Sequence, residues 1–175
     1  MLARRAAEGD AESFGVLVQR YVPAGRRVAR VVLRDDHEAD DAVQDGLLSA
    51  WQAIDRYDPG RPFRPWLMRI IVNAARDLQR RRQVRAADEL PPSLAGRLSP
   101  ERDTEDALFR ERLGEALAAL PERKRVAVTL FDVEGYSHAE IAELLGVPVG
   151  TVRSDVFHAR RALREALAPF REANS

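Results

Sequence analysis

Four polar side chains share one face of a predicted helix near the middle of the chain, and their chemistry suits single-stranded DNA. They recur at helical spacing, opposite an apolar stripe: Arg69, Asn73, Arg76 and Arg80. Arginines neutralise phosphates, while the Asn73 amide offers both a donor and an acceptor to an exposed base edge. The pattern predicts a surface for unpaired DNA, with an ordinary solvated helix face as the alternative.

Two aromatic residues stand at the start of the same predicted helix. Phe63 and Trp66 have ring faces on which unstacked bases can lie. Aromatic side chains at the start of a helix are more often part of the core, so we expect a structural role for Trp66.

An acidic pair lies one turn apart on an earlier predicted helix, with Gln44 between Asp41 and Asp45. Acid–base chemistry would need a partner with a tuned pKa, and metal binding would need convergent ligands. The chain has no phosphate-binding glycine loop and no nucleophile elbow. Its histidines are scattered: His37, His138 and His158. We therefore expect no enzymatic activity, metal or cofactor, and either a solvated acidic face or a docking face for a basic helix.

The C-terminal third predicts a helix-turn-helix, a motif that lays its second helix in the DNA major groove. Ser137 and Glu140 have the spacing of a capping box, Gly146 suits a helix stop, and Pro148 suits the start of the next helix. Apolar residues then recur at helical spacing on one side of the second helix. We expect its polar residues to face DNA: Thr151, Arg153, Ser154, Asp155, His158 and Arg161.

Composition limits the class of protein. The chain has 175 residues, a net charge of zero and no cysteine, which excludes disulfides and thiolate metal sites. It has no apolar run of transmembrane length and no signal-peptide core, so we expect a cytoplasmic protein without membrane insertion. Acidic residues concentrate between positions 35 and 58 and basic residues between 60 and 85. Adjacent blocks of opposite charge indicate two surfaces for two partners.

Nearly every other segment also has a helical pattern. Asp10 is a predicted N-cap, Pro23 and Gly25 are expected to kink or break the first helix, and further helices are expected near residues 37–54 and 65–82. Residues 85–106 lack periodicity and contain several prolines, which predicts a flexible linker. We predict an all-α protein with two small helical domains, residues 1–84 and 107–175.

Four stretches, in order and spacing, resemble the extracytoplasmic-function (ECF) class of bacterial RNA polymerase sigma factors. They are GDAESFGVLVQRY, DDAVQDGLLSAW, FRPWLMRIIVNAARDLQRRR and LPERKRVAVTLFDVEGYSHAEIAELLGVPVGTVRS. The resemblance covers essentially the whole chain. It implies a region 2 domain, a linker threading toward the polymerase active centre, and a region 4 domain.

The resemblance also implies partners and roles for residues. Asp41, Gln44 and Asp45 would dock on the clamp helices of the largest polymerase subunit, and the second domain on the flap region. Asn73 would bind a base flipped from the −10 element, with Arg69, Arg76 and Arg80 on nearby DNA. The −35 element would be read by the polar face of the second helix-turn-helix helix. An anti-sigma factor is a further expected partner, and the free chain is expected to be a monomer.

Asp155 and His158 depart from the family pattern, which usually has basic residues at both positions. A carboxylate near DNA can accept from a cytosine amine but repels phosphate. We therefore expect Asp155→Arg to strengthen binding to duplex DNA.

Two other functions fit parts of the sequence. A dimeric helix-turn-helix regulator explains the C-terminal third but not the acidic helix or the Asn73 face. A polymerase-binding adaptor that no longer recognises promoters is suggested only by Asp155.

Overall fold

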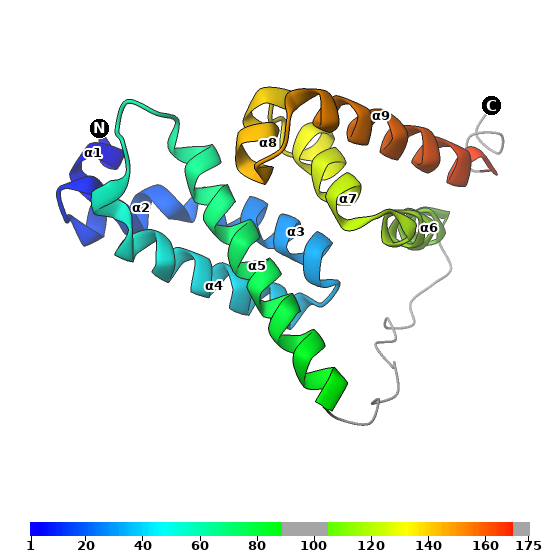
Figure 1. The fold of residues 1–175 in the computed structure, drawn as a ribbon, viewed down its shortest axis with the longest axis horizontal. Coiled ribbons are helices and arrows are strands. Elements are labelled where there is room, and N and C mark those ends of the chain that lie inside the picture. The colour runs from blue at the N-terminus through cyan, green and yellow to red at the C-terminus, as the bar shows by residue number, and fades with distance from the viewer. Residues whose placement is uncertain (89–104, 170–175) are drawn as a thin grey trace.

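The computed structural model describes residues 1–88 and 105–169, which form two helical domains packed against each other (Figure 1). These residues contain helices and turns but no strand, which confirms the predicted all-α class. The first domain contains α1 (Leu2–Ala7), α2 (Ala11–Gln19), α3 (Val22–Leu33), α4 (Asp36–Gln52), a 3₁₀ turn (Ile54–Arg56) and α5 (Phe63–Asp88). The second contains α6 (Glu105–Ala119), α7 (Glu122–Val128), a π-helical turn (Thr129–Val133), α8 (His138–Leu145) and α9 (Val149–Ala166).

The third helix of the sequence-based prediction is longer in the structure than expected. α5 continues to Asp88 rather than stopping near residue 82, because no glycine or proline interrupts it before Pro91. Most of the linker predicted at 85–106 falls on residues 89–104, which lie outside the described residues.

The first helices begin where the sequence supplies caps. The Asp10 carboxylate accepts a hydrogen bond from the Ser13 amide at 3.1 Å, which confirms the predicted N-cap of α2. The break predicted at Pro23 and Gly25 comes earlier, at Tyr21. Pro23 lies in the first turn of α3, where its missing N–H leaves no helix bond unmade.

α3, α4 and α5 pack closely because glycines face the middle of α5. A methyl group on Gly25 would come within 2.8 Å of the Ile71 side chain, and one on Gly46 within 3.1 Å of the Ile71 backbone Cα. Val28, Val32 and Ile71 are fully buried at this crossing. This packing fixes the positions of α4 and α5 relative to each other. α4 carries the acidic face, and α5 carries the Asn73 face.

Gly46→Ala is expected to destabilise the chain by about 1–2 kcal/mol, because overpacking against a backbone atom outweighs the gain in helix propensity. Gly114→Ala is the matched control. Its helical position has no atom within 4 Å of an added methyl group, so it should stabilise by about 0.5–1 kcal/mol. Chemical denaturation of both variants measures the difference. Equal changes in stability for the two variants would show that the α4–α5 crossing accommodates a methyl group at Gly46 without overpacking.

The second domain lies along the first through two helix pairs. α8 packs against α5, and α7 packs against α3 (Figure 1). Most buried side chains of both domains form one continuous cluster, in which Ile71 of α5 and Ile141 of α8 are both fully buried. Leu120, Val128 and Ala159 form a second, smaller cluster. The arrangement of the two domains is therefore held by buried side chains that pack across the interface between them.

Candidate nucleic-acid interface

Three of the four residues predicted to form the DNA face of α5, Asn73, Arg76 and Arg80, line one hollow in the structure, and Arg69 lies outside its lining. Asn73, Arg69 and Arg80 are exposed, and Arg76 is half-buried. Arg80 pairs with Asp77 one turn away, while Arg76 donates at 2.9 Å to Glu122, which belongs to the second domain. Asn73, Arg76, Asp77, Gln79, Arg80 and Glu122 line an open hollow of about 580 Å³.

The aromatic residues at the start of α5 are structural, as expected. Phe63 is buried, and the partly buried Trp66 lies with its ring centroid 5.0 Å from Tyr57 and 5.4 Å from Phe63. Three rings packed in this way anchor the start of α5 in the first domain.

The acidic face of α4 is exposed and includes an apolar residue, Leu48, that was not among the predicted docking residues. Asp41, Gln44 and Asp45 all face solvent, and Asp45 lies 3.5 Å from Arg81 of α5. Leu48, one turn further along, is 57% exposed. Its spacing from Gln44 and Asp45 would have revealed it, because residues three and four apart share a helix face.

The helix-turn-helix is built from the caps that the sequence predicted. The Ser137 hydroxyl accepts from the Glu140 amide at 3.2 Å, and the Glu140 carboxylate accepts from the Ser137 amide at 2.8 Å. Gly146 ends α8 with a φ of 68°, and Pro148 is the N-cap of α9. The predicted capping box, stop and start are all confirmed, and they fix the angle at which α9 leaves α8.

α9 exposes most of its predicted DNA-facing residues, with one clear exception. Arg153, Ser154, His158 and Arg161 are exposed, and Thr151 is half-buried. The expected exposure of Asp155 is wrong, because this side chain is only 4% exposed. Asp155 lies on the inner stripe of α9, with Val152, Val156 and Ala159.

Asp155 is buried because an arginine of α7 neutralises it. Arg123 Nε donates to Asp155 Oδ2 at 2.6 Å, and its Nη2 reaches Oδ1 at 3.5 Å. This hydrogen bond and the carboxylate charge raise the pKa of Arg123. The two residues join the start of α7 to the middle of α9, so Asp155 has a positioning role in the second domain. Asp155 therefore does not face DNA, and the reason for expecting Asp155→Arg to improve DNA binding does not hold.

An ion-pair swap tests this role. Asp155→Arg is expected to lower the melting temperature by roughly 5 °C or more, because it opposes two guanidinium groups at a buried position. The double variant Asp155→Arg with Arg123→Asp should recover most of the loss, since it restores opposite charges at the same sites. Thermal unfolding of the three variants, including Arg123→Asp alone, completes the cycle. Additive losses would mean that the two side chains do not interact.

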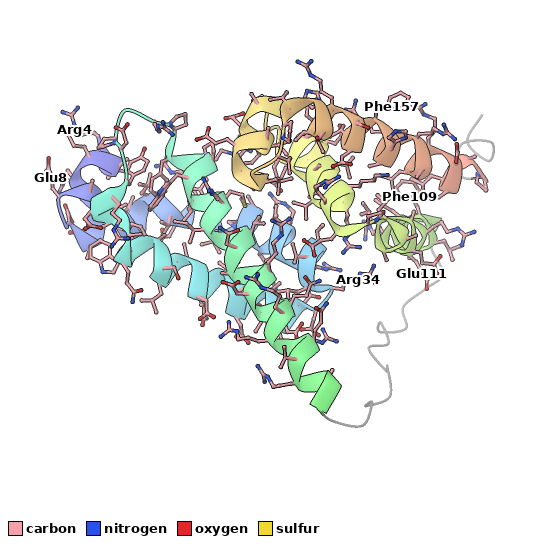
Figure 2. The ribbon with its side chains drawn as sticks, in the orientation of Figure 1. Arg4, Glu8, Arg34, Phe109, Glu111 and Phe157 are labelled. Carbon is pink, nitrogen blue, oxygen red and sulfur yellow. The ribbon has the colours of Figure 1, made fainter. Side chains whose placement is uncertain are left out.

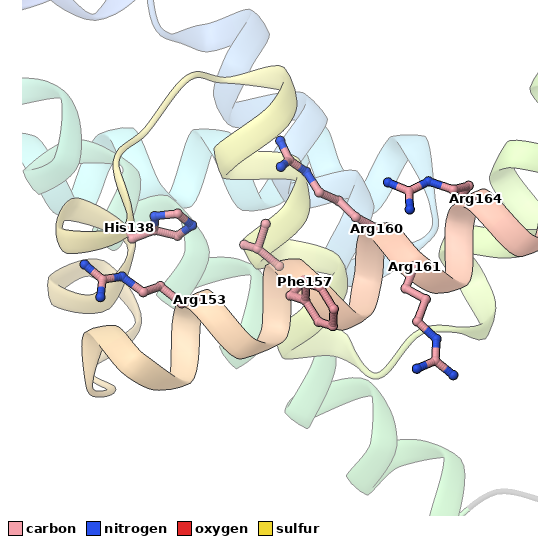
Figure 3. A pocket seen from close by; sticks show the side chains of 7 residues that line it. His138, Arg153, Phe157, Arg160, Arg161 and Arg164 are labelled. Atoms are coloured by element: carbon pink, nitrogen blue, oxygen red, sulfur yellow. The ribbon is translucent and has the colours of Figure 1, made fainter.

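A basic hollow runs along the exposed side of α9, and Phe157 is one of its lining residues (Figure 3). Phe157 is 64% exposed and projects from the helix (Figure 2). Phe157 is not among the residues predicted to face DNA, although its position off the inner stripe indicated exposure. The hollow is lined by His138, Arg153, Val156, Phe157, Arg160, Arg161 and Arg164.

Not every arginine around this hollow is free for DNA. Arg160 pairs with Asp132, with Nε 2.9 Å from Oδ2, and lies 4.9 Å from the centre of the Phe131 ring. Arg161 pairs with Glu165 at 3.0 Å within α9. Two of the four arginines that line the hollow are therefore already engaged in ion pairs.

Residues 1–88 and 105–169 contain no group of three or more potential metal-ligating side chains. Across the same residues, no helix is both long and apolar enough to pass through a lipid bilayer. The fold is that of a two-domain helical protein with a helix-turn-helix module.

Comparisons with known proteins place that class within a family. The chain matches the sigma-70 region 2 family over residues 17–85 and the sigma-70 region 4 family over residues 110–163. It is 40% identical to the RNA polymerase sigma factor NccH of Alcaligenes xylosoxydans xylosoxydans, covering 95% of this chain and 92% of NccH. It is 34% identical to the ECF RNA polymerase sigma-E factor of Escherichia coli K12, covering 97% and 94%.

A solved structure agrees. The sigma factor RpoE of Bartonella quintana, in complex with the anti-sigma factor NepR, matches with a TM-score of 0.73 and 27% identity, covering 90% of this chain and 98% of RpoE. The chain belongs to the ECF sigma factors, and the resemblance stated from the sequence is confirmed. It is an alternative sigma factor of RNA polymerase, and the dimeric regulator is not favoured.

Proposed function

We propose that this chain selects promoters by holding two DNA-binding faces and one polymerase-binding face on a single polypeptide. The observation that carries the proposal is the joint presence of the Asn73 face on α5 and the helix-turn-helix face on α9. The polymerase performs the chemistry of RNA synthesis, and this chain contributes none. We further propose that the protein acts in the cytoplasm.

The α5 face is proposed to open the −10 element. Asn73 would hold a base flipped out of the non-template strand, while Arg69, Arg76 and Arg80 hold the neighbouring phosphates. Unstacking a base costs a few kcal/mol, and capture of that base on the protein offsets the cost. The exposure of Asn73 and its place among cations support this assignment.

The α9 face is proposed to read the −35 element. Thr151, Arg153 and Ser154 lie in the first two turns of α9, the part of a recognition helix that meets base edges. His158 and Arg161 follow on the outer side, and Phe157 adds an apolar surface for a thymine methyl group. Asp155 takes part only by holding α9 against Arg123.

The acidic face of α4 is proposed to bind core RNA polymerase. Asp41, Gln44 and Asp45 would meet the basic clamp helices of the largest subunit, with Leu48 as an apolar contact at the same surface. Acidic side chains with one exposed leucine fit a basic, amphipathic partner helix. The second domain would dock on the flap region.

We also propose that an anti-sigma factor regulates the chain and that the free chain is a monomer. The first proposal is supported by the similarity to RpoE, which is solved in complex with the anti-sigma factor NepR.

Stoichiometry tests the function as a whole. Analytical ultracentrifugation of the chain alone should show a monomer, and a mixture with purified core polymerase should show a one-to-one complex. A dimer that does not bind core polymerase would contradict the proposal and would favour a dimeric helix-turn-helix regulator instead. A complex with core polymerase that starts no transcription would favour the adaptor.

A further inference from the structure

Another basic hollow lies where α3, α5 and α7 meet. It is open to solvent and has a volume of about 390 Å³, a size that small-molecule sites commonly have. Part of its lining is aliphatic, and the polar part consists of Arg34, Gln79, Arg82, Gln83, Glu122 and Arg125. This α3–α5–α7 hollow adjoins the hollow beside Asn73 through Gln79 and Glu122. It includes none of the residues proposed to bind DNA or core polymerase.

Arg125 is a buried cation that has no carboxylate partner in the described part of the chain. It is 5% exposed, its Nε donates to the Val31 carbonyl at 2.7 Å, and its Nη1 donates to the Leu120 carbonyl at 3.1 Å. The hydrogen bonds of Arg125 to the described residues use only Nε and Nη1. No buried side-chain nitrogen of these residues lacks a partner, so Nη2 is accessible from the surface. Arg125 therefore offers one N–H edge to the hollow that it lines.

Arg34 brings a second guanidinium to the hollow from the end of α3. It is exposed, lies where α3 comes close to α6 (Figure 2), and donates to the Ala118 carbonyl. Its φ of 62° is left-handed, and among the described residues no other residue except glycine has a positive φ. A Cβ makes this conformation unfavourable, whereas glycine adopts it readily. An arginine thus stands where glycine would suit the backbone better, which indicates a use for the guanidinium.

The two guanidinium groups repel each other. Burial lowers the pKa of Arg125, the charge of Arg34 lowers it further, and Glu122 opposes both effects. A main-chain carbonyl satisfies an N–H donor but supplies no full negative charge. An anion in the hollow would relieve both the repulsion and the burial of an unpaired charge.

The other charged residues of the hollow are already paired. Glu122 Oε1 lies 2.9 Å from Arg76 Nε, so the one carboxylate of the lining is engaged outside the hollow. Arg82 Nη1 lies 2.9 Å from Glu38 Oε2, and the Arg82 side chain is 54% exposed. The uncompensated charge of the hollow therefore belongs to Arg34 and Arg125, with Arg82 at hand beside them.

We propose that the α3–α5–α7 hollow binds a small molecule with two or more linked phosphate groups, held by Arg34 and Arg125. A guanidinium group matches phosphate oxygens with paired hydrogen bonds, and two such groups call for an anion of more than one charge. Arg82 is exposed enough to reach a further phosphate. The site does not depend on the proposed function, because it uses none of the residues assigned to DNA or polymerase.

The rest of the lining favours a nucleoside di- or triphosphate over inorganic polyphosphate. The amides of Gln79 and Gln83 offer donors and acceptors to the edge of a base, and the aliphatic lining suits the face of a ring. Inorganic polyphosphate would use the arginines alone. Because the hollow takes residues from both domains, a bound ligand should also raise the melting temperature of the whole chain.

Isothermal titration calorimetry on the full chain tests the site with ATP, AMP and inorganic tripolyphosphate. ATP and tripolyphosphate should each bind with saturation, one per chain. AMP has a single phosphate and loses at least one charged hydrogen-bonded contact, so it should bind about tenfold more weakly than ATP.

Arg34→Gly separates a ligand-binding role from a structural one. It should weaken binding of ATP and tripolyphosphate about tenfold or more, because a charged hydrogen-bond donor is lost. It should not lower the melting temperature, because glycine suits the left-handed backbone. Arg4→Gln is the matched control for charge. Arg4 is exposed on α1, far from Arg34 (Figure 2), and its replacement should leave ATP binding within about twofold.

Gln83→Leu distinguishes the two sources of phosphate without changing the charge. Gln83 is exposed on α5, so the fold should tolerate leucine there. If the ligand is a nucleotide, the variant should weaken ATP binding about threefold and leave tripolyphosphate binding unchanged, because only the base loses a partner. If ATP and tripolyphosphate bind equally and Gln83→Leu changes neither, the phosphate site stands and its ligand is inorganic polyphosphate.

Three results would overturn the proposal. The first is no saturable binding of either ATP or tripolyphosphate. The second is an equal loss in Arg34→Gly and Arg4→Gln, which would show a general attraction of anions to a charged surface. The third is a loss of affinity for a random-sequence single-stranded 20-mer in Arg34→Gly as large as the loss for ATP, which would assign the hollow to DNA.

Discussion

Asn73→Ala is expected to reduce open-complex formation roughly ten- to hundredfold while core polymerase binding stays within twofold. A well-placed amide pair to a base edge contributes about 1–3 kcal/mol, and each 1.4 kcal/mol is a factor of ten. The exposed amide is available for such a pair. Alanine keeps the helix intact, so the loss should appear in the melting step, measured by permanganate reactivity of unpaired thymines.

Gln79→Ala is the matched control for Asn73→Ala. Gln79 is an amide of the same helix that lines the same hollow and donates to the Val32 carbonyl at 3.4 Å. It should leave melting nearly unchanged. Equal losses of melting and core binding in Asn73→Ala would indicate misfolding, and normal melting would remove Asn73 from the −10 site.

The double variant Asp41→Arg with Asp45→Arg should weaken core polymerase binding at least a hundredfold. Both carboxylates are exposed on α4, and reversing them sets like charges against a basic partner, at a cost of several kcal/mol. The fold should survive, because neither side chain is buried and Asp45 has only a long contact to Arg81. Fluorescence titration of labelled chain with core polymerase measures the loss.

Glu8→Arg with Asp55→Arg changes the net charge by the same amount at other exposed positions of the first domain. This control should bind core polymerase with an affinity close to that of the unmodified chain. If both double variants lose binding equally, net charge rather than the α4 face governs docking. If neither loses binding, the docking surface lies elsewhere.

Local signals in the sequence predicted the helices and caps well. The Ser137–Glu140 capping box, the Gly146 stop and the Asp10 cap all form, because each depends on residues within one turn. The Asn73 face was likewise predictable, since its members belong to one helix. Pro23 was misjudged because the same residue that breaks a helix interior also begins the next helix.

Contacts between distant residues were not predictable in the same way. Asp155 was expected outside because its charge is typical of exposed positions, yet Arg123, 32 residues earlier, neutralises it on the inner face. The burial of Arg125 depends on Val31, 94 positions away. A helical period identifies a face, but it does not identify the partner that covers the face.

Run-off transcription tests the central claim most directly. Purified core polymerase is incubated with fragmented genomic DNA of the source organism, with and without this chain, and new transcripts are mapped. Promoter selection by this chain predicts discrete start sites that appear with the chain, disappear with Asn73→Ala, and share upstream −10 and −35 sequences. New start sites that persist unchanged with Asn73→Ala, or no new start sites despite demonstrated core binding, would contradict it.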